Sequence, residues 1–387
     1  MTKGIIISGG WGTRLRPLTC TIPKPLIPIL NKPVLERQIL LLKSAGISDI
    51  TLAVSVMADV LKEYFKDGKR LGVEIRYTDE RSPMGTAGAI KLAEDHLKDD
   101  NFFMLNGDVL LNFDFIEILK THEKNKGLGV IGGKFVDDPS RFGVLIIEES
   151  SNRITEFLEK DEYKPPGGKI IPMPINAGVY LLEPDVFDYI EASKKVSIER
   201  DVFPKLASKG KLYYYPIPGI WKDIGKPEEL LEGNIEFMQE ILHSLKDSKK
   251  NLISDTLDIE GKALIYPPVT IGENVTILNK CEIGPNVIIG DNVYIGENTK
   301  IKETLIYNKT YISNNVNIEK AIISDNCLIQ DNVELKGRDQ NLVILASYVQ
   351  VLKNVKMSAP INSSMTVCHH ETVNSELGNF KFQNGAL

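Results

Sequence analysis

The sequence predicts two architectures in one chain, an α/β half with a mostly parallel sheet and then a parallel β-helix of six-residue repeats. Up to about residue 240, short β-branched runs alternate with longer helical patterns, which is typical of βαβ units with helices on both faces of a sheet. From Leu264 onward this alternation stops, and an aliphatic residue recurs every six positions. The length of 387 residues agrees with such a division, because it suggests two or three domains.

The first half divides into expected strands and helices by the spacing of its apolar residues. Strands are expected at residues 3–8, 50–55, 73–77, 102–106 and 178–182, and helices at 35–45, 60–69, 87–97, 116–126 and 227–245. The segment 243–251 is rich in lysine and holds no aromatic residue, so it is expected to be an exposed linker.

The second half keeps one aliphatic register over nineteen positions, interrupted by two five-residue steps and one longer excursion. Neither a helix nor an alternating strand has this period, so it predicts a solenoid of about six coils, in which each repeat stacks on the next. A β-sandwich with accidental spacing is the weaker alternative. Glycine follows the inward isoleucine at positions 272, 284, 290 and 296, where turns with positive φ are expected. The register positions are Ile265, Ile271, Ile277, Ile283, Ile289, Ile295, Ile301, Ile306, Ile312, Ile318, Ile323, Ile329, Leu335, Val343, Val349, Val355, Ile361, Val367 and Val373.

Composition excludes several classes of protein. Fifty-two acidic residues against 46 basic ones give a net charge of −6, so no basic footprint indicates nucleic-acid binding. No apolar run approaches the roughly 18 residues needed to span a bilayer, and the N-terminal apolar run is too short for a signal peptide. The four cysteines are unpatterned, as in a reduced environment. We therefore expect a cytoplasmic protein without nucleic-acid or membrane partners.

A glycine-rich turn after the first strand is the most informative segment. Gly9, Gly10, Gly12 and Thr13 offer backbone N–H groups that a phosphate could approach, and Arg14 and Lys24 add positive charge suited to pyrophosphate. The segment is neither a Walker A loop nor a GxGxxG fingerprint, because Leu15 stands where the third glycine would be. A plain glycine turn with surface bases is the alternative.

Residues 9–25 resemble the signature of the sugar-1-phosphate nucleotidylyltransferases, also called NDP-sugar pyrophosphorylases. Further motifs follow in that family's order at residues 83–88, 106–108, 157–160, 176–178 and 221–225. The resemblance covers about residues 1–240 and is closest to the mannose-1-phosphate guanylyltransferase branch, through residues 139–144, 175–180, 197–204 and 219–225. Members of that branch carry a C-terminal left-handed β-helix, which agrees with the six-residue period.

The resemblance implies a Rossmann-like nucleotidyltransferase domain at residues 1–240, a linker at 241–260, a left-handed β-helix at 261–375 and a tail at 376–387. It also implies the site residues. Arg14, Lys24 and Lys160 are expected to be catalytic, and Asp108 and Asp223 to bind Mg²⁺. The expected nucleotide-binding residues are Gly9, Gly10, Gly12, Thr13, Arg14, Gly85, Thr86, Asn106 and Asp108, and the expected sugar-phosphate-binding residues are Gly143, Glu159, Lys160 and Asn176.

Both aspartates end apolar runs, where open α/β sheets gather ligand groups, although a turn aspartate is the alternative for Asp108. The chain departs from the family at two points: Ser8 replaces a small apolar residue, and Asp161 follows the motif lysine where the family usually has proline. The expected reaction is in-line attack of a sugar 1-phosphate on the α-phosphorus of a nucleoside triphosphate, GTP and mannose 1-phosphate being favoured. No general base is needed, because the sugar phosphate is already ionised at neutral pH.

Three other functions stay open. Glucose 1-phosphate with UTP, dTTP or ATP would use the same chemistry. A non-catalytic regulatory or assembly subunit would keep the architecture but is expected to lack some of the residues Arg14, Lys24, Asp108, Lys160 and Asp223, all of which are present here. An acetyltransferase would use His369 or His370, but adjacent histidines point to opposite faces of a strand. We expect self-association through the β-helix, because a solenoid has edges that need covering.

Overall fold

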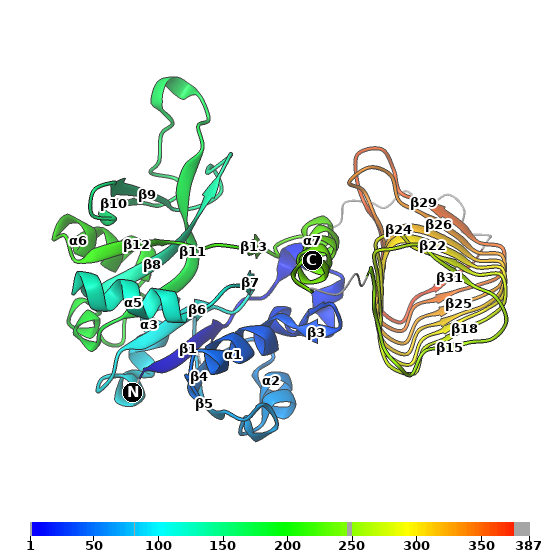
Figure 1. The fold of residues 1–387 in the computed structure, drawn as a ribbon, viewed down its shortest axis with the longest axis horizontal. Helices are drawn as coiled ribbons and strands as arrows, with labels where there is room; N and C mark the ends of the chain where they lie inside the picture. The colour runs from blue at the N-terminus through cyan, green and yellow to red at the C-terminus, as the bar shows by residue number, and fades with distance from the viewer. Residues whose placement is uncertain (1, 81, 246–249, 375–387) are drawn as a thin grey trace. The chain divides into compact units, whose positions relative to one another are not determined.

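The structure is a computed structural model that describes residues 2–80, 82–245 and 250–374 (Figure 1). It contains two compact units, and each of them combines segments that are distant in the sequence. We call them the sheet unit, which comprises Met1–Trp11, Pro23–Leu26 and Val34–Asp223, and the solenoid unit, which comprises Gly12–Ile22, Ile27–Pro33 and Ile224–Leu387.

The sheet unit is built on a nine-stranded sheet with the order β5-β4-β1-β6-β11-β8-β12-β10-β9 (Figure 1). Its first four strands are parallel, β11 is antiparallel to both β6 and β8, and β12 is parallel to β8. The strands are β1 (Lys3–Ser8), β4 (Asp49–Val54), β5 (Glu74–Asp79), β6 (Phe102–Asn106), β8 (Gly129–Val136), β9 (Val144–Glu148), β10 (Arg153–Leu158), β11 (Met173–Leu182) and β12 (Leu212–Pro216).

Helices cover both faces of this sheet, as the alternating sequence pattern predicts. Successive residues of β1 face opposite sides, so Ile5 belongs to one buried cluster and Ile6 to the other. Helices α3 (Gly85–Leu92) and α6 (Phe203–Ser208) pack in the first cluster. The second cluster contains α1 (Val34–Ser44), α2 (Ala58–Phe65) and α5 (Ile116–Asn125). The short helix α4 (Glu94–Leu97) contributes Leu97 to the first cluster.

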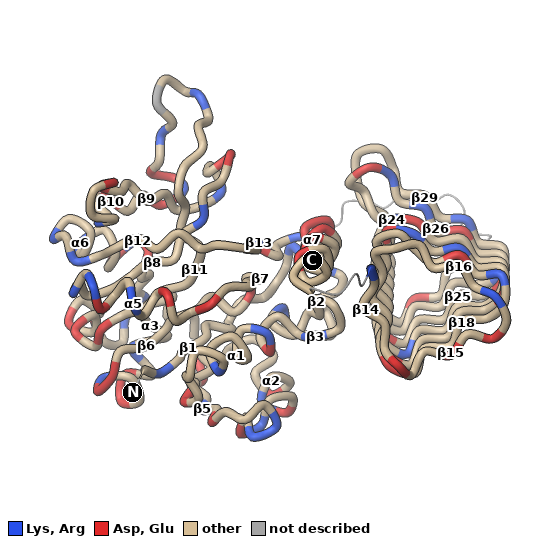
Figure 2. The backbone as a smooth tube through the Cα atoms, in the orientation of Figure 1, with Lys and Arg blue, Asp and Glu red and all other residues tan. Residues whose placement is uncertain are grey.

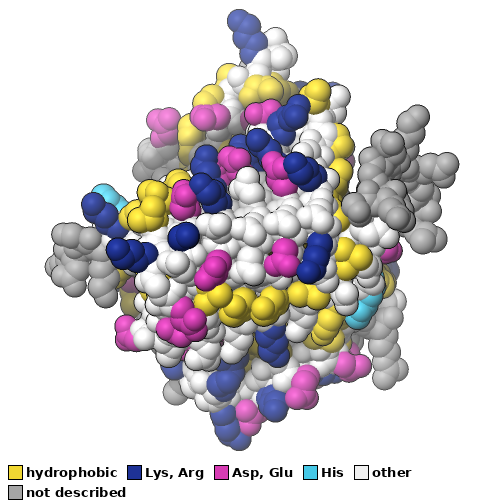
Figure 3. Space-filling view, turned by 90° about the vertical axis from the view of Figure 1, so that its right-hand side faces the viewer, with side chains coloured by type: hydrophobic (Ala, Val, Ile, Leu, Met, Phe, Trp, Pro, Cys, Tyr) yellow, Lys and Arg dark blue, Asp and Glu magenta, His cyan; other side chains and the backbone are white. Residues whose placement is uncertain are grey.

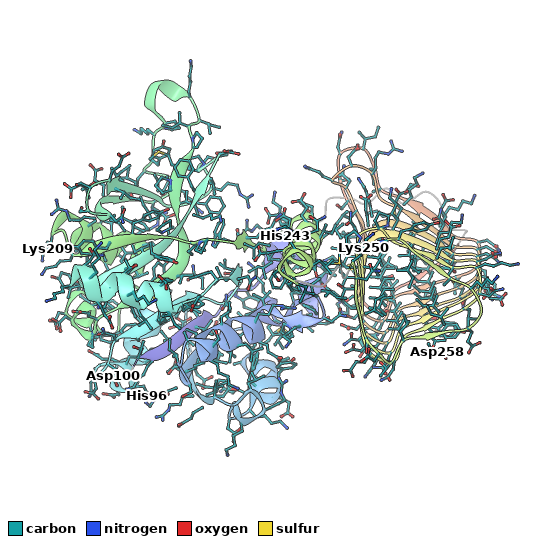
Figure 4. The ribbon with its side chains drawn as sticks, viewed as in Figure 1. His96, Asp100, Lys209, His243, Lys250 and Asp258 are labelled. Carbon is teal, nitrogen blue, oxygen red and sulfur yellow. The ribbon has the colours of Figure 1, made fainter. Side chains whose placement is uncertain are left out.

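Polar contacts fix the start of β1 beside the loop that precedes β6. Lys3 Nζ donates to the carbonyl oxygen of His96 at 2.6 Å and lies 3.3 Å from a carboxylate oxygen of Asp100; Figure 4 labels both partners. These contacts position the strand that leads into the glycine-rich turn.

The solenoid unit contains the predicted parallel β-helix. Seven two-residue strands stack in parallel register as one sheet: β15 (Asp258–Ile259), β18 (Thr276–Ile277), β21 (Tyr294–Ile295), β23 (Tyr311–Ile312), β25 (Leu328–Ile329), β28 (Gln350–Val351) and β31 (Thr372–Val373). An eleven-stranded sheet forms the other sides: β14 (Leu252–Ile253), β16 (Leu264–Ile265), β17 (Val269–Ile271), β19 (Glu282–Ile283), β20 (Val287–Ile289), β22 (Lys300–Ile306), β24 (Asn317–Ile323), β26 (Glu334–Lys336), β27 (Val343–Leu345), β29 (Lys356–Ser358) and β30 (Met365–Val367). The inward aliphatic residues form one buried core. The predicted fold class is confirmed.

The expected role of the glycines in the coils is wrong at three positions. Of the four glycines named, Gly284 has a positive φ, whereas the turns use asparagine for that conformation, for example Asn292 and Asn298. Gly290 is needed for another reason: an added Cβ would lie 2.8 Å from the backbone nitrogen of Asn308 in the next coil. The short distance between stacked coils, rather than the turn conformation, therefore excludes side chains there.

The coils also differ from the predicted register and boundaries. Ile361, expected inside, is 70 % exposed, because it lies in a corner connection at 359–364 that interrupts the six-residue period. The predicted linker 241–260 already contains solenoid strands, since β14 pairs with β17 and β15 with β18. Lys250 and Asp258 are labelled at this first coil in Figure 4. Residues 246–249 of that linker and the predicted tail 376–387 lie outside the described residues.

Charged residues form a ladder on one face of the β-helix. Lys300 lies 2.7 Å from Glu282 of the preceding coil, and Lys302 lies 3.3 Å from Glu319 of the following one. Figure 2 accordingly shows both basic and acidic residues along the coils, and in Figure 3 basic and acidic side chains lie side by side. Such pairs contribute little stability singly, but they keep this face polar.

A second face of the β-helix is covered by other parts of the solenoid unit. Ile288, Leu305, Ile322 and Ile344 occupy the outward-facing middle positions of their strands, yet each is at most 1 % exposed. Hydrogen bonds join the two N-terminal segments of the unit to this region: Asn31 Nδ2 to Ile289 O at 2.7 Å, Tyr307 Oη to Pro28 O at 3.4 Å, and the hydroxyls of Thr21 and Ser347 to each other at 3.4 Å. The helix α7 (Pro227–Ser244) contacts the same segments, since Asn234 Oδ1 accepts from Leu30 N at 2.8 Å.

Candidate active site

Two central strands of the sheet unit deliver the predicted site residues to one edge. β1 and β6 are parallel neighbours, and Ile7 pairs with Asn106 at their carboxyl ends. The glycine-rich turn leaves β1 at this edge, and Asn106-Gly107-Asp108 leaves β6 there. Open α/β sheets bind ligands outside the carboxyl ends of such strands.

A pocket of about 330 Å³ lies at this edge. Seven of the predicted site residues line it: Gly9, Gly10, Lys24, Gly85, Thr86, Asn106 and Asp108. The remaining lining residues are Ile7, Ser8, Pro25, Glu80, Pro83, Gly107 and Lys195. A larger cavity of about 930 Å³ lies along α2, and no predicted site residue lines it. The predicted site residues therefore gather at the smaller pocket.

Glycine is suited to two positions of the pocket for different structural reasons. An added Cβ on Gly10 would meet no atom within 4 Å, so this backbone faces open space that a phosphate can enter. Gly85 has a φ of +74°, and an added Cβ would lie only 2.4 Å from the carbonyl oxygen of Val196. The loop before α3 therefore requires glycine where it meets the segment at 196.

Lys24 joins the two predicted metal-binding aspartates. Its Nζ lies 2.5 Å from Asp108 Oδ2 and 3.9 Å from Asp223 Oδ1. Asp223 reaches this place because β13 (Ile220–Asp223) is antiparallel to β7 (Val109–Asn112), with Asp223 paired to Val109. The lysine side chain is 9 % exposed, so both carboxylates face a cation that is largely withdrawn from water.

The donor set of these two residues fits Mg²⁺. Two carboxylates that converge on one cationic nitrogen can instead converge on a divalent ion, whose other ligands would be phosphate oxygens and water. Asp108 is 41 % exposed, so it is open to such ligands. Among the described residues no group of three or more His, Cys, Asp or Glu side chains is placed to hold a metal ion.

The predicted sugar-phosphate residues lie together in the sheet unit. Asn176 N donates to Gly143 O at 2.8 Å, and Asn176 Nδ2 donates to the hydroxyl of Tyr180 at 2.9 Å. Burial raises the pKa of Tyr180 well above its usual value, so the hydroxyl keeps its proton. Glu159 and Lys160 follow β10, where the Lys160 amide donates to Glu159 Oε1 at 3.1 Å.

The remaining predicted residues, Gly12, Thr13 and Arg14, belong to the solenoid unit. Gly12 is in the left-handed region at φ 59°, and its carbonyl oxygen accepts from the Thr19 hydroxyl at 2.8 Å. An added Cβ on Gly225 would lie 2.8 Å from an Arg14 guanidinium nitrogen, so Arg14 packs against the backbone just before α7.

Comparison with known families shows the family of the chain. Residues 3–240 match the family described as Nucleotidyl transferase, and residues 265–381 match the one described as GMPPB C-terminal domain. The chain belongs to the nucleotidyl transferase family.

Curated relatives in this family share much of the chain. A Saccharomyces cerevisiae protein named "Mannose-1-phosphate guanyltransferase" is 42% identical over 272 residues, which cover 68% of this chain and 72% of that protein. An Oryza sativa protein named "Probable mannose-1-phosphate guanylyltransferase 2" is 38% identical and covers 74% of this chain and 75% of its own length. The resemblance inferred from the motifs is thereby confirmed.

Solved structures of similar fold cover the N-terminal part. A putative glucose-1-phosphate thymidylyltransferase from Bacillus anthracis, in complex with a sucrose, has a TM-score of 0.55 and 27% identity, and covers 64% of this chain and 98% of its own. HddC from Yersinia pseudotuberculosis, complexed with GMP-PN, has a TM-score of 0.52 and 29% identity, and covers 61% of this chain and all of its own.

Two residues of this nucleotidyl transferase pocket were missed by sequence reasoning. Glu80 lies in it with its Oε1 accepting from Met84 N at 3.3 Å, and burial raises the pKa of this carboxyl above its usual value. Lys195 also lines the pocket but falls just before the 197–204 segment used for the family resemblance. The position of Glu80 directly after β5, a strand of the same sheet, was the one available signal.

Proposed function

We propose that this nucleotidyl transferase joins GTP and mannose 1-phosphate to give GDP-mannose and pyrophosphate. The observation that carries the proposal is the pocket in which glycine backbone, Lys24 and Asp108 meet at the carboxyl edge of β1 and β6. The names of the relatives at 37–42% identity favour mannose 1-phosphate and a guanylyl group. None of the helices within residues 2–80, 82–245 and 250–374 combines the length and the hydropathy of a membrane-spanning segment.

Glu80 favours guanine over other bases. A carboxylate accepts hydrogen bonds, and the Watson–Crick edge of guanine offers two neighbouring donors, N1–H and the exocyclic amine. Adenine presents an acceptor at N1, which a carboxylate would repel. In the pocket this carboxylate is partly withdrawn from water, so an unmatched base would leave it without a full partner.

The chain's own residues would then act by placement and charge. The sugar phosphate carries its own nucleophilic oxygen, so catalysis rests on holding it in line with the α-phosphorus. Lys24 would neutralise charge on the triphosphate, Arg14 the leaving pyrophosphate, and Lys160 the incoming phosphate. Asp108 and Asp223 would hold Mg²⁺, which neutralises phosphate charge when it is bound.

A panel of triphosphates and sugar 1-phosphates, scored by pyrophosphate release, tests the proposal. We expect the highest kcat/KM with GTP and mannose 1-phosphate. A higher kcat/KM for glucose 1-phosphate with UTP, dTTP or ATP would contradict the proposed substrates but support the proposed reaction type. No release with any pair, at any Mg²⁺ concentration, would favour the regulatory alternative.

Self-association through the β-helix stays a prediction. Light scattering of the full-length chain measures its mass in solution directly. A monomer of 43.2 kDa across the working concentration range would contradict it.

A further inference from the structure

One turn of the sheet unit contacts three predicted substrate-binding segments. We call it the anchor turn, residues 197–202. Glu199 Oε2 accepts from the Thr86 hydroxyl of the nucleotide loop at 2.6 Å, and Glu199 Oε1 accepts from the Tyr180 hydroxyl at 3.5 Å. Tyr180 in turn accepts from the Asn176 amide. The third contact, between Arg200 and Asp161, reaches the segment that follows Lys160.

The anchor turn is itself well fixed. Ser197 N donates to Asp201 Oδ2 at 2.8 Å, and the Ser197 hydroxyl accepts from Arg200 N at 3.3 Å. Ile198 and Val202 are fully buried in the core of the sheet unit. A side chain that leaves this turn therefore starts from a stable position.

Arg200 and Asp161 form a two-point contact. Arg200 Nη1 lies 3.1 Å from Asp161 Oδ2, and Nη2 lies 2.8 Å from Oδ1. A fork of two parallel N–H···O bonds restricts orientation as well as distance. The Arg200 guanidinium holds the pKa of Asp161 below its usual range, so the pair is charged at neutral pH.

The pair stands at the start of the long connection between β10 and β11. Asp161 follows Lys160 directly, and Gly167 and Gly168 adopt the left-handed conformation before β11 begins at Met173. Hydrogen bonds from Glu162 N and Tyr163 N to Glu159 O shape the turn that carries Lys160. The Arg200–Asp161 pair connects this turn to the anchor turn, which lies elsewhere in the chain.

We propose that Arg200 is a positioning residue for Lys160: its bidentate pair with Asp161 holds the chain next to Lys160 on the anchor turn and so sets the affinity for the sugar 1-phosphate. This inference rests on the proposed function, in which Lys160 binds that phosphate. The two side chains are 44 % and 60 % exposed, so the pair adds little to global stability, and its effect is local.

The test compares Arg200→Gln with wild type in two assays. We expect KM for mannose 1-phosphate to rise by about three- to fivefold, the range that exposed ion pairs support, while KM for GTP and kcat stay unchanged. Arg200→Lys should rescue part of the loss, because it keeps the charge but not the fork. The reversed pair Asp161→Arg with Arg200→Asp should restore more of it.

A matched control is Arg153→Gln. Arg153 pairs with Glu148 at 3.0 Å, and these side chains are 43 % and 40 % exposed, but neither residue lines the pocket. This variant should leave every kinetic constant unchanged. The inference would be overturned if Arg200→Gln raised KM equally for mannose 1-phosphate and for GTP. It would also be overturned if Arg153→Gln raised KM for mannose 1-phosphate as much as Arg200→Gln does.

Hydrogen exchange separates this inference from the proposed function. Backbone amides of residues 160–164 should exchange faster in Arg200→Gln than in wild type or Arg153→Gln. Unchanged exchange would overturn the positioning role even if the enzyme is active. Faster exchange in Arg200→Gln, together with no pyrophosphate release by the wild-type protein, would overturn the proposed function but support the positioning role of Arg200.

Discussion

The ammonium nitrogen of Lys24 lies 2.5 Å from a carboxylate oxygen of Asp108 and 3.9 Å from one of Asp223. One cation thus neutralises two carboxylates in the place where the family resemblance expects Mg²⁺. A bound Mg²⁺ ion would act on the same two charges as the lysine, and their effects on stability should then be coupled.

Lys24→Met tests this coupling. We expect the variant to lose roughly 1–2 kcal/mol of unfolding free energy without Mg²⁺, because Lys24 no longer neutralises Asp108 and Asp223, although Arg141 stays 4.0 Å from Asp223. Mg²⁺ should recover more stability in the variant than in wild type. Thermal unfolding with and without Mg²⁺ measures both, and an equal metal effect in the two proteins would contradict the shared site.

Asp108→Asn should reduce kcat by at least about a hundredfold at any Mg²⁺ concentration, since the variant loses one charged ligand of the ion that would neutralise the reacting phosphates. The protein should stay folded by circular dichroism, because Asp108 is 41 % exposed. Asp188→Asn, in an exposed position outside the pocket, is the control. Full activity in Asp108→Asn would remove Asp108 from the site.

Glu80→Gln should lower kcat/KM for GTP by about ten- to a hundredfold, the cost of losing hydrogen bonds to a charged group, and should change UTP turnover much less. Inosine triphosphate, which lacks the exocyclic amine, should be a poorer substrate than GTP for wild type only. Since the pKa of Glu80 is raised, the wild-type preference for GTP should fade on acidification at a pH above the usual 4.5. Equal losses with GTP and UTP would exclude base recognition by Glu80.

Two aspartates of the β-helix should respond to pH in opposite directions. Burial raises the pKa of Asp325, so wild-type stability falls as pH rises from the usual 3.8 through the raised value. Asp325→Asn should therefore gain about 1 kcal/mol near neutral pH and less below pH 4. Thermal unfolding at several pH values measures this gain.

Asp331 is the matched contrast. It accepts from Asn314 N at 3.1 Å, and this hydrogen bond lowers its pKa. Its stabilising effect is present above the usual 3.8 and is lost as pH falls through the lowered value. Asp331→Asn should thus destabilise the neutral protein, and a stabilising effect would contradict the assignment.

Local spacing was sufficient to predict β1, β4, β5, β6 and β11 of the nine-stranded sheet, whereas β8, β9, β10 and β12 were not predicted. The strand at 3–8 and the strand at 102–106 coincide with β1 and β6, because a buried central strand is apolar throughout. The six-residue period predicted the solenoid, since each coil repeats the same burial. The prediction that Ile361 is buried was wrong because an inserted corner shifts it out of the core. The prediction of positive φ at three of the glycines was wrong because the distance to the next coil, which the spacing along one coil does not report, is what requires glycine there.

The sequence by itself determined which chemistry-bearing residues end the central strands and in which order their motifs occur. Only the tertiary structure decided what they meet. β13 pairs with β7 and brings Asp223 to Lys24, Arg200 reaches Asp161 from another element, and Glu80 enters the pocket. The physical reason is that these contacts join residues tens to hundreds of positions apart. Their distances depend on strand pairing and packing rather than on any local pattern.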